Sequence, residues 1–426
     1  MQSAIYFFIT LFAVMSVGVP VAVAMMVCGI VLMLTLGYFE PTALSMNVMY
    51  GINSFPLMAI PFFVLSGELM SRGGLAKHIV NFAKLLVGGR RGGLGYTAIL
   101  ASMLFAGLSG SGIADAAAIG GMLIPLMAHN NYNRARSAAL VSAGGILAPL
   151  IPPSNPFIIL GTAVNLSISK LFMGSLVPGI LIGLGLMVVW FFVVRKDGYQ
   201  DVAKIPAAEV LPILKKSIPA LMMVVIIVGG IRFGLFTPTE AGAFAAVYAL
   251  LVCKFYYREL SWKELYSAMR ATVASTASIV FICGGATMAG YYITLARIPA
   301  TLASTLTQMI DSPLVLLLSV NALLLFMGMI MDITPNILIF APILLPVGVA
   351  AGFDPYYFAF LIGLNLIIGA ITPPIGIVMF VTSKVAGVKV TDLVAKQWPF
   401  LAVYVFFLLL YILFPQLYLV PLGWLR

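Results

Sequence analysis

The sequence predicts an all-α polytopic membrane protein built from two inverted repeats. Its 426 residues are 62% hydrophobic and 8% charged, whereas a soluble domain carries about 25% charged residues. Glycines and prolines recur at a fixed spacing in the two halves of the chain, and the lysines and arginines lie in short loops between apolar segments. Because basic residues placed in this way indicate topology, the net charge of +10 does not point to nucleic acid.

The repeat is visible in residues that break helices. Gly107 and Gly328 are 221 positions apart, and the same shift relates Pro152-Pro153 to Pro373-Pro374. Nearer the N-terminus the shift becomes 218, so one small insertion or deletion separates the halves. Since glycine and proline decide where a helix must stop, a duplicated pattern of breaks predicts a duplicated backbone.

Three spans are expected before the first break of each repeat. In the first repeat they are Ile5–Val17, Pro20–Leu36 and Phe55–Met70, and in the second Ser217–Phe233, a helix that begins at Thr237, and Thr272–Tyr292. Thr237, Pro238 and Glu240 have the spacing of a capping box with proline at the first helical position. Lys77, His78 and Lys84 form an amphipathic stretch expected to lie on the membrane surface.

A re-entrant hairpin is predicted over Leu94–Ala128, interrupted at Gly107–Gly112. Its arms of about 13 to 16 residues measure roughly 20–24 Å, which is short for a bilayer about 30 Å thick. Basic residues precede and follow it, namely Arg90, Arg91, Arg134 and Arg136. Both ends therefore belong on the same, positively charged side.

The second hairpin is expected over Pro313–Val347, with its break at Met331–Pro335. Asp311 and Asp354 flank it and no basic residue lies near, so both of its ends belong outside. Each hairpin precedes a helix broken at a proline pair and then a last span. These last spans are Leu171–Val194 and Trp398–Phe414.

Five crossings in each repeat make the second repeat inverted relative to the first. Of the 23 lysines and arginines, only four fall on the outer face: Lys170, Arg232, Arg297 and Arg426. Both termini are then predicted outside the cytoplasm. The divisions expected are scaffold helices and a cytoplasmic arm (1–93), a first transport part (94–168), a last helix, linker and second set of scaffold helices (169–312), a second transport part (313–390) and a C-terminal span (391–426).

Chemistry is expected where the helices break, because bare backbone groups in hydrocarbon cost several kcal/mol each and must face protein or a polar cavity. Unwound carbonyls suit Na⁺, and half-helix N-termini suit a carboxylate. Two cation sites are predicted, one from Ser109, Gly110 and Ser111 with residues 152–155, the other from Asp332 and Thr334 with Thr372 and Pro373. Substrate is expected between them, at Ser154, Asn155 and Gly376.

Two carboxylates lie deep in the apolar pattern. Asp332 is interpreted as a cation ligand, whereas Asp115 either touches an ion or caps and orients the hairpin arm. Glu68 and Glu240 are interpreted as structural, the first near the membrane edge and the second in the cap.

Two other functions compete with transport. Gly107-Leu-Ser109-Gly matches the GxSG of an intramembrane serine protease, but the only histidines, His78 and His129, are predicted outside the apolar spans. A passive channel would need a continuous polar stripe, whereas the polar residues cluster at the breaks. The sequence has no HExxH zinc motif and no GxxxxGK[ST] phosphate loop, so uphill transport must use an ion gradient or an energy-coupling partner.

Four motifs carry a family resemblance that extends over essentially the whole chain. They are Phe105-Ala-Gly-Leu-Ser-Gly-Ser-Gly-Ile-Ala-Asp115, Ile151-Pro-Pro-Ser154, Gly328-Met-Ile-Met-Asp332-Ile-Thr334-Pro and Ile371-Thr-Pro-Pro-Ile-Gly376. Together with the segment that begins at Phe55, they resemble the large membrane subunit of TRAP (tripartite ATP-independent periplasmic) transporters. Asn155 departs from the Ser-Ile-Pro that many members have after the proline pair.

The resemblance implies a non-enzymatic, elevator-type, ion-transporter-like protein of the bacterial inner membrane that imports organic acids with Na⁺. Sialic acid and C4-dicarboxylates both fit the family. It implies a small four-helix membrane subunit and a periplasmic substrate-binding protein as partners. It also places Ser109, Ser111 and Asp115 in the first hairpin motif, Asp332 and Thr334 in the second, and Thr372 in the second helix break.

Overall fold

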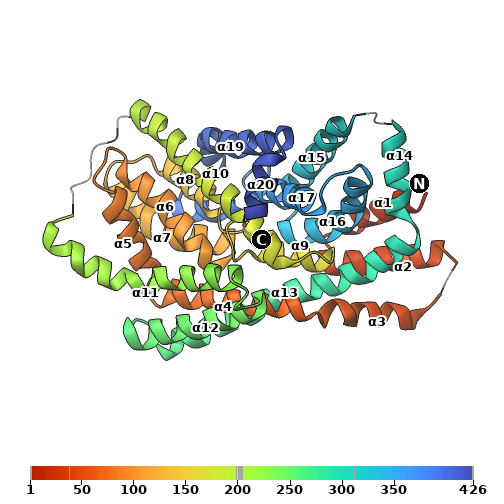
Figure 1. The fold of residues 1–426 in the computed structure, drawn as a ribbon, viewed down its shortest axis with the longest axis horizontal. Helices are drawn as coiled ribbons and strands as arrows, with labels where there is room; N and C mark the ends of the chain where they lie inside the picture. Colours follow the sequence, from red (N-terminus) through yellow and green to blue (C-terminus); the bar gives the residue numbers. More distant parts are fainter. Residues whose placement is uncertain (1, 38, 198, 200–204, 310–311, 425–426) are drawn as a thin grey trace.

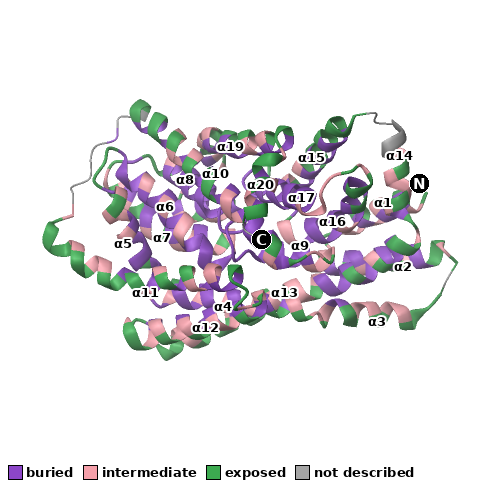
Figure 2. Ribbon diagram, viewed as in Figure 1, coloured by how far each residue is buried: buried purple, intermediate pink, exposed green. Residues whose placement is uncertain are grey.

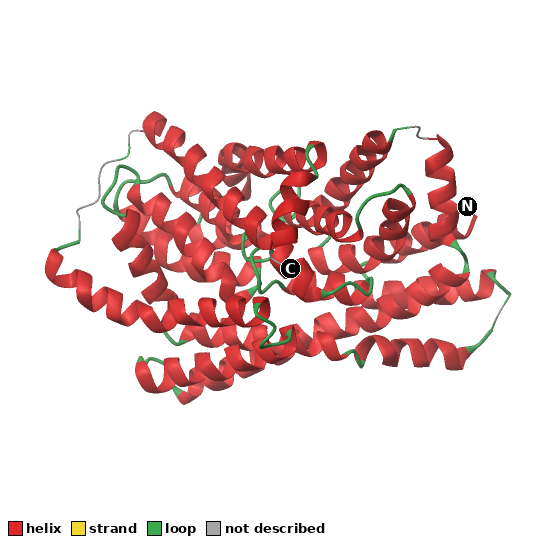
Figure 3. Cartoon of the chain, viewed as in Figure 1, coloured by secondary structure: helices red, strands yellow, loops and turns green. Residues whose placement is uncertain are grey.

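The computed structural model describes residues 2–37, 39–197, 199, 205–309 and 312–424. This part of the chain is helical, with loops between the helices and no strand (Figure 3). Eight of its helices are long and apolar enough to cross a membrane. The predicted all-α fold class is confirmed. Asp311 and Arg426, which entered the prediction of topology, lie outside the described residues.

The helices follow the predicted repeat. The first repeat contains α1 (Gln2–Ser16), α2 (Val21–Thr35), α3 (Pro41–Ile52), η1 (Phe55–Met58), α4 (Ala59–Arg72), α5 (Leu75–Val87), α6 (Gly93–Ser109), α7 (Gly112–His129), α8 (Arg134–Gly145), α9 (Asn155–Ala163) and α10 (Ile168–Asp197). The second contains α11 (Ala207–Arg232), α12 (Pro238–Leu251), η2 (Val252–Tyr256), α13 (Trp262–Leu295), α14 (Ile298–Met309), α15 (Pro313–Ile330), α16 (Ile333–Ala350), α17 (Pro355–Gly369), α18 (Ile377–Ala386), α19 (Val390–Leu413) and α20 (Gln416–Trp424).

The two repeats pack in matching ways. The helix before each break packs against the hairpin of its own repeat, α8 against α6 and α7 and α17 against α15 and α16. The helix after each break packs against the opposite hairpin, α9 against α16 and α18 against α7. The hairpins lie toward opposite ends of the long axis in Figure 1. Each repeat therefore completes the other, as an inverted duplication predicts.

The first hairpin begins and ends at the same end of the molecule. The indole N–H of Trp190 donates to the carbonyl oxygen of Gly92, just before α6, over 2.9 Å. The Trp190 ring also stacks with Tyr132, just after α7, at a centroid distance of 6.4 Å. One side chain thus joins both ends of the hairpin, so the chain enters and leaves it at the same end of the molecule, as predicted.

Long scaffold helices run side by side along the lower edge of Figure 1, where α4 packs against α12, and α2 and α3 pack against α13. Small residues permit the close crossings. A Cβ atom at Gly285 would meet the carbonyl oxygen of Ala22 at 2.5 Å, and one at Gly51 would meet the Thr287 side chain at 2.6 Å. Figure 2 shows α8 and α17 almost wholly buried, whereas α3 is mostly half-exposed or exposed.

Several scaffold helices are longer than predicted. The predicted span Thr272–Tyr292 lies inside α13, which starts at a capping box formed by Ser261 and Glu264. Phe55–Met70 is preceded by α3, and the pair is bent by 44°. The sequence pattern also did not single out α14 and α20. The predictions were too short because an apolar run marks only the middle of a helix, whereas the ends are polar and are determined by capping. The predicted capping box at Thr237 and Glu240 is present.

The amphipathic stretch is the helix α5, and its histidine faces protein. The His78 ring is buried and stacks on Tyr257 with a centroid distance of 4.2 Å. Its Nε2 lies 3.9 Å from Oε1 of Glu259, and its backbone carbonyl accepts a hydrogen bond from Ser217 at 3.0 Å. α5 is therefore held to the second repeat at α11 and at the segment after η2.

This contact predicts a pH dependence. Burial lowers the pKa of His78, with Lys216 and Lys77 acting in the same direction and Glu259 opposing them. A histidine is half-protonated near pH 6.5 in the unfolded chain, so the unfolded state takes up the proton first. The stability that depends on neutral His78 is present above about pH 6.5 and is lost as the pH falls below it. Thermal unfolding between pH 7.5 and 5.5 should show this loss in the wild type and less of it in His78→Gln.

His129→Gln is the matched control, because His129 is the exposed last residue of α7. An equal loss of stability in the wild type and in His78→Gln would contradict this assignment.

Candidate functional site

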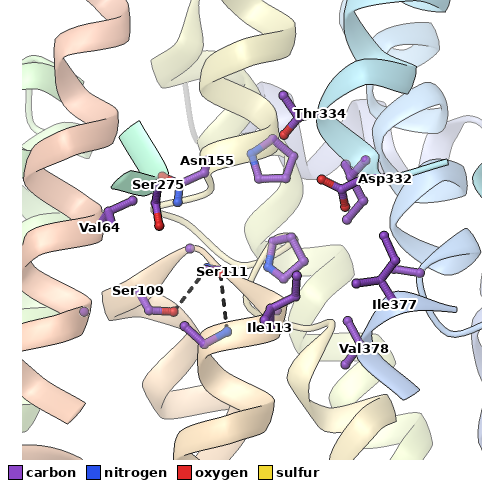
Figure 4. A pocket seen from close by; sticks show the side chains of 18 of the residues that line it. Val64, Ser109, Ser111, Ile113, Asn155, Ser275, Asp332, Thr334, Ile377 and Val378 are labelled. Atoms are coloured by element: carbon purple, nitrogen blue, oxygen red, sulfur yellow. Dashed lines mark hydrogen bonds between the residues drawn. The ribbon is translucent and has the colours of Figure 1, made fainter. Parts of the chain in front are cut away.

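A central cavity of about 510 Å³ lies where the two hairpin tips meet the two helix breaks. α4 and α13 close it from the scaffold side (Figure 4). Its lining includes Val64, Gly67, Glu68, Ser109, Gly110, Ser111, Gly112, Ile113, Asn155, Ser275, Ile279, Asp332, Thr334, Ala370, Ile377 and Val378. Backbone breaks from both repeats therefore face one space, as expected for unwound segments at membrane depth.

The tip of the first hairpin is Gly110-Ser111, shorter than the predicted interruption because α6 continues through Ser109. Gly110 has φ of +61°, and a Cβ atom there would lie 2.6 Å from the carbonyl oxygen of Pro153. Only glycine adopts this conformation readily and lets the tip approach the break so closely. The Ser111 hydroxyl caps α7 by accepting from the backbone N–H of Ala114 at 3.4 Å.

Asp115 lies behind this tip and does not line the cavity. It is fully buried, and the Ser109 hydroxyl donates to its Oδ1. Oδ2 has no hydrogen-bond partner among the described residues. Ser109 Oγ in turn accepts the backbone N–H of Ser111 at 3.1 Å. The carboxylate thus holds a side chain that shapes the tip, and one of its oxygens has unused capacity to accept.

The tip of the second hairpin places Asp332 in the cavity wall. Asp332 is the exposed residue just before α16, so it lies at the positive end of that helix dipole. Asn336 holds the tip from behind: its Nδ2 donates to the carbonyls of Met331 at 3.0 Å and Met327 at 3.2 Å. Asn336 was not among the predicted site residues. An amide side chain one helical turn after a predicted break could have indicated a residue that holds the tip.

The two helix breaks span residues 146–154 and 370–376, and each contains a cis Pro-Pro peptide bond. In the first, the buried Ser154 hydroxyl donates to the carbonyl of Pro149 and caps α9 by accepting from Phe157. In the second, the carbonyl oxygens of Ala370 and Thr372 lie 3.4 and 3.3 Å from the Cβ position of Gly376, which has φ of +52°. Carbonyl oxygens of this kind are ligands for a hard cation.

The structure brings six of the eleven predicted site residues into the lining. These are Ser109, Gly110, Ser111, Asn155, Asp332 and Thr334. The other five, Asp115, Ser154, Thr372, Pro373 and Gly376, lie outside it, in the hairpin arm or in the breaks themselves. Thr372 turns its hydroxyl back to the carbonyl of Ile368 at 2.8 Å.

Scaffold residues that were not predicted also reach the cavity. Glu68 lines it and forms an ion pair with Arg72 at 2.9 Å, and Arg72 donates to Ser267 of α13 at 3.0 Å. The interpretation of Glu68 as a residue of the membrane edge therefore missed its place in the cavity wall. Ser275 of α13 also lines the cavity, as does Asn155 of α9 (Figure 4).

The geometry gives no support to a protease. The Ser109 hydroxyl donates to a carboxylate, and none of the described residues that line the cavity is a histidine. His78, in α5, stacks on Tyr257, and His129 is the last residue of α7, at the end of that helix opposite to the tip. A serine nucleophile requires an adjacent general base.

Residues 8–417 match the model of the family described as "Tripartite ATP-independent periplasmic transporter, DctM component". The chain is 42% identical over 411 residues to the 2,3-diketo-L-gulonate TRAP transporter large permease protein YiaN of Escherichia coli, covering 96% of this chain and 97% of that one. It is 37% identical to the sialic acid TRAP transporter large permease protein SiaM of Vibrio cholerae, covering 94% and 93% of the two chains.

A solved structure shares the fold. The crystal structure of the Alcanivorax borkumensis YdaH transporter, described as having an unusual topology, superposes with a TM-score of 0.63. The match covers 87% of this chain and 86% of that one at 13% identity. At that identity the likeness concerns the fold alone.

Proposed function

Because the chain belongs to the DctM component family and is the large permease subunit of a TRAP transporter, we propose that it carries out Na⁺-coupled uptake of an organic acid across the bacterial inner membrane. The observation that carries the proposal is the central cavity, in which both hairpin tips and both helix breaks meet. Carbonyl and hydroxyl oxygens beside two inverted breaks provide cation ligands, and the N-termini of α9 and α16 favour a carboxylate.

The proposal includes two cation sites. Ser109, Gly110 and Ser111 with the first break would hold one Na⁺, with Asp115 orienting Ser109 from behind. Asp332 and Thr334 with the carbonyls of the second break would hold the other. Substrate would lie between them at Asn155.

An elevator motion is proposed for the transport step. The hairpins and broken helices pack on one another across the repeats, and α4 and α13 meet them at the cavity. Residues 94–168 and 313–390 would move as one transport domain along the scaffold. Both termini would lie in the periplasm, because most lysines and arginines belong to the opposite face.

A tripartite system supplies the proposed partners, a small membrane subunit and a soluble periplasmic protein that delivers the substrate. The substrate class is an organic acid, within which relatives are named for 2,3-diketo-L-gulonate and for sialic acid. C4-dicarboxylates are also among the proposed substrates.

The test is uptake into liposomes that contain the permease with its two partners. Labelled 2,3-diketo-L-gulonate, sialic acid and succinate should each be offered with and without an inward Na⁺ gradient. We expect accumulation of one acid above its external concentration only with the gradient. Uptake that is unchanged when K⁺ replaces Na⁺ would rule out the coupling. Flux that never saturates and never exceeds equilibration would favour a passive channel.

A further inference from the structure

A second cavity of about 430 Å³ lies where the scaffold helices α3 and α13 meet α9 and α16. No charged side chain lines it among the described residues. Amides and hydroxyls do, among them Asn47, Tyr50, Ser54, Thr162, Asn165 and Thr287. A neutral polar lining of this kind binds hydroxyl groups and carbonyls by hydrogen bonds.

The second cavity is lined by the same face of α13 as the central one. On α13, Ser275 and Ile279 line the central cavity, and Cys283, Thr287 and Thr294 line the second one. Spacings of four residues, and of seven from Thr287 to Thr294, keep all five on one helix face, and the eight residues from Ile279 to Thr287 correspond to about 12 Å. The same face of α13 thus passes through both cavities.

Helices of the transport part show the same continuity. On α9, Asn155 lines the central cavity and Ile159 and Thr162 line the second. On α16, Thr334 lines the central cavity and Leu338 the second, again four residues further along. Faces of the same helices therefore bound both spaces, so the second cavity lies one to two turns further along the helices that line the central one.

A cation lies next to the second cavity in the chain. Arg297 is an exposed residue that follows α13, and its backbone N–H donates to the carbonyl of Thr294, which lines the second cavity, at 2.9 Å. It is one of the few cations that the sequence predicts on the outer face. Arg297 would attract an anion toward a cavity whose lining is neutral.

We propose that the second cavity is a binding site for the hydroxylated organic anion on its way to the central cavity, on the periplasmic side. The inference rests on the proposed function and adds a site to it. Tyr50, Thr287 and Asn47 would contact the hydroxyl groups of the acid, and the central cavity would take it up when the transport domain moves.

Gly290 allows the cavity to be filled without disturbing its neighbours. It lines the second cavity within α13, and a Cβ atom there has nothing within 4 Å. Gly290→Leu should lower Na⁺-driven uptake at least about 10-fold, because the leucine side chain would fill the cavity that the acid is proposed to enter. Gly229→Leu on α11 is the matched control, since its Cβ position is equally free and it lines neither cavity.

A second measurement separates binding from blocked motion. Tyr50→Phe and Thr287→Val each remove one hydroxyl with little change of volume. Loss of a hydrogen bond should raise the half-saturating concentration of the transported acid by about 2- to 10-fold, with a smaller change in maximal rate. A fall in maximal rate alone would show that these residues serve only the sliding of helices.

The outcomes distinguish the two proposals. Wild-type uptake in Gly290→Leu, beside Na⁺-driven uptake in the wild type, overturns the second site and leaves the proposed function in place. Absence of Na⁺-driven uptake in the wild type removes both. Reduced uptake in Gly290→Leu but not in Gly229→Leu, together with raised half-saturation in the hydroxyl variants, supports the site.

Discussion

Asp332→Asn is expected to lower Na⁺-driven uptake by at least about 100-fold. Asp332 is the one carboxylate that a hairpin tip presents to the central cavity, at the start of α16. Asparagine keeps the shape and removes the charge that would compensate a cation. A hundredfold loss corresponds to about 2.8 kcal/mol of cation binding, since each factor of ten is about 1.4 kcal/mol.

The measurement is initial uptake against Na⁺ concentration in liposomes that contain the complete transporter. The variant should need a much higher Na⁺ concentration or show no response. Asp392→Asn is the control, because Asp392 is an exposed carboxylate in the first turn of α19 that lines neither cavity. A wild-type Na⁺ response in Asp332→Asn would show that Asp332 only ends the helix break.

Gly110→Ala is expected to abolish most uptake and to destabilise the protein. The residue has φ of +61°, and a Cβ atom would lie 2.6 Å from the carbonyl oxygen of Pro153 and 3.0 Å from the amide nitrogen of Asn155. Left-handed backbone strain alone costs about 1–3 kcal/mol in a residue other than glycine. The clash must also push the tip away from the break, which would separate the atoms proposed to hold the first cation.

Gly387→Ala separates strain from the clash. Gly387 has φ of +64° at the end of α18, and its Cβ position has nothing within 4 Å. It should lose stability by a similar strain energy and keep its uptake once folded. Thermal unfolding and uptake per folded protein are the two readouts. If both variants transport at the wild-type rate, the close approach of tip and break is not needed for cation binding.

Local signals predicted most of the backbone. Glycine and proline fix where a helix stops, so both hairpins and both breaks were placed within a few residues, the first tip at Gly110-Ser111 inside the predicted 107–112. The distribution of lysines and arginines among the loops supported the prediction that the second repeat is inverted relative to the first. Helices α3, α14 and α20 were not predicted, because they are not separate long apolar runs.

Side-chain direction was less predictable. Asp115 and Asp332 are both carboxylates beside hairpin tips, yet one is buried behind Ser109 and the other faces the cavity. Glu68 follows an apolar run in the same way as many helix ends, and its place in the cavity wall depends on how α4 meets the hairpins. The periodicity of the sequence predicts which residues share one face of a helix. Which other helix packs against that face depends on distant parts of the chain.

The amino-acid sequence by itself determined that this is a duplicated, inverted, all-helical membrane protein of the TRAP large permease family, because helix breaks, apolar spans and loop charges are local properties of the chain. Tertiary structure alone decided which residues share the central cavity and that some of the same helices bound a second, neutral cavity. Each wall combines helices from both repeats, α9 with α16 and α18 with α7, and such contacts form only when the two halves pack together.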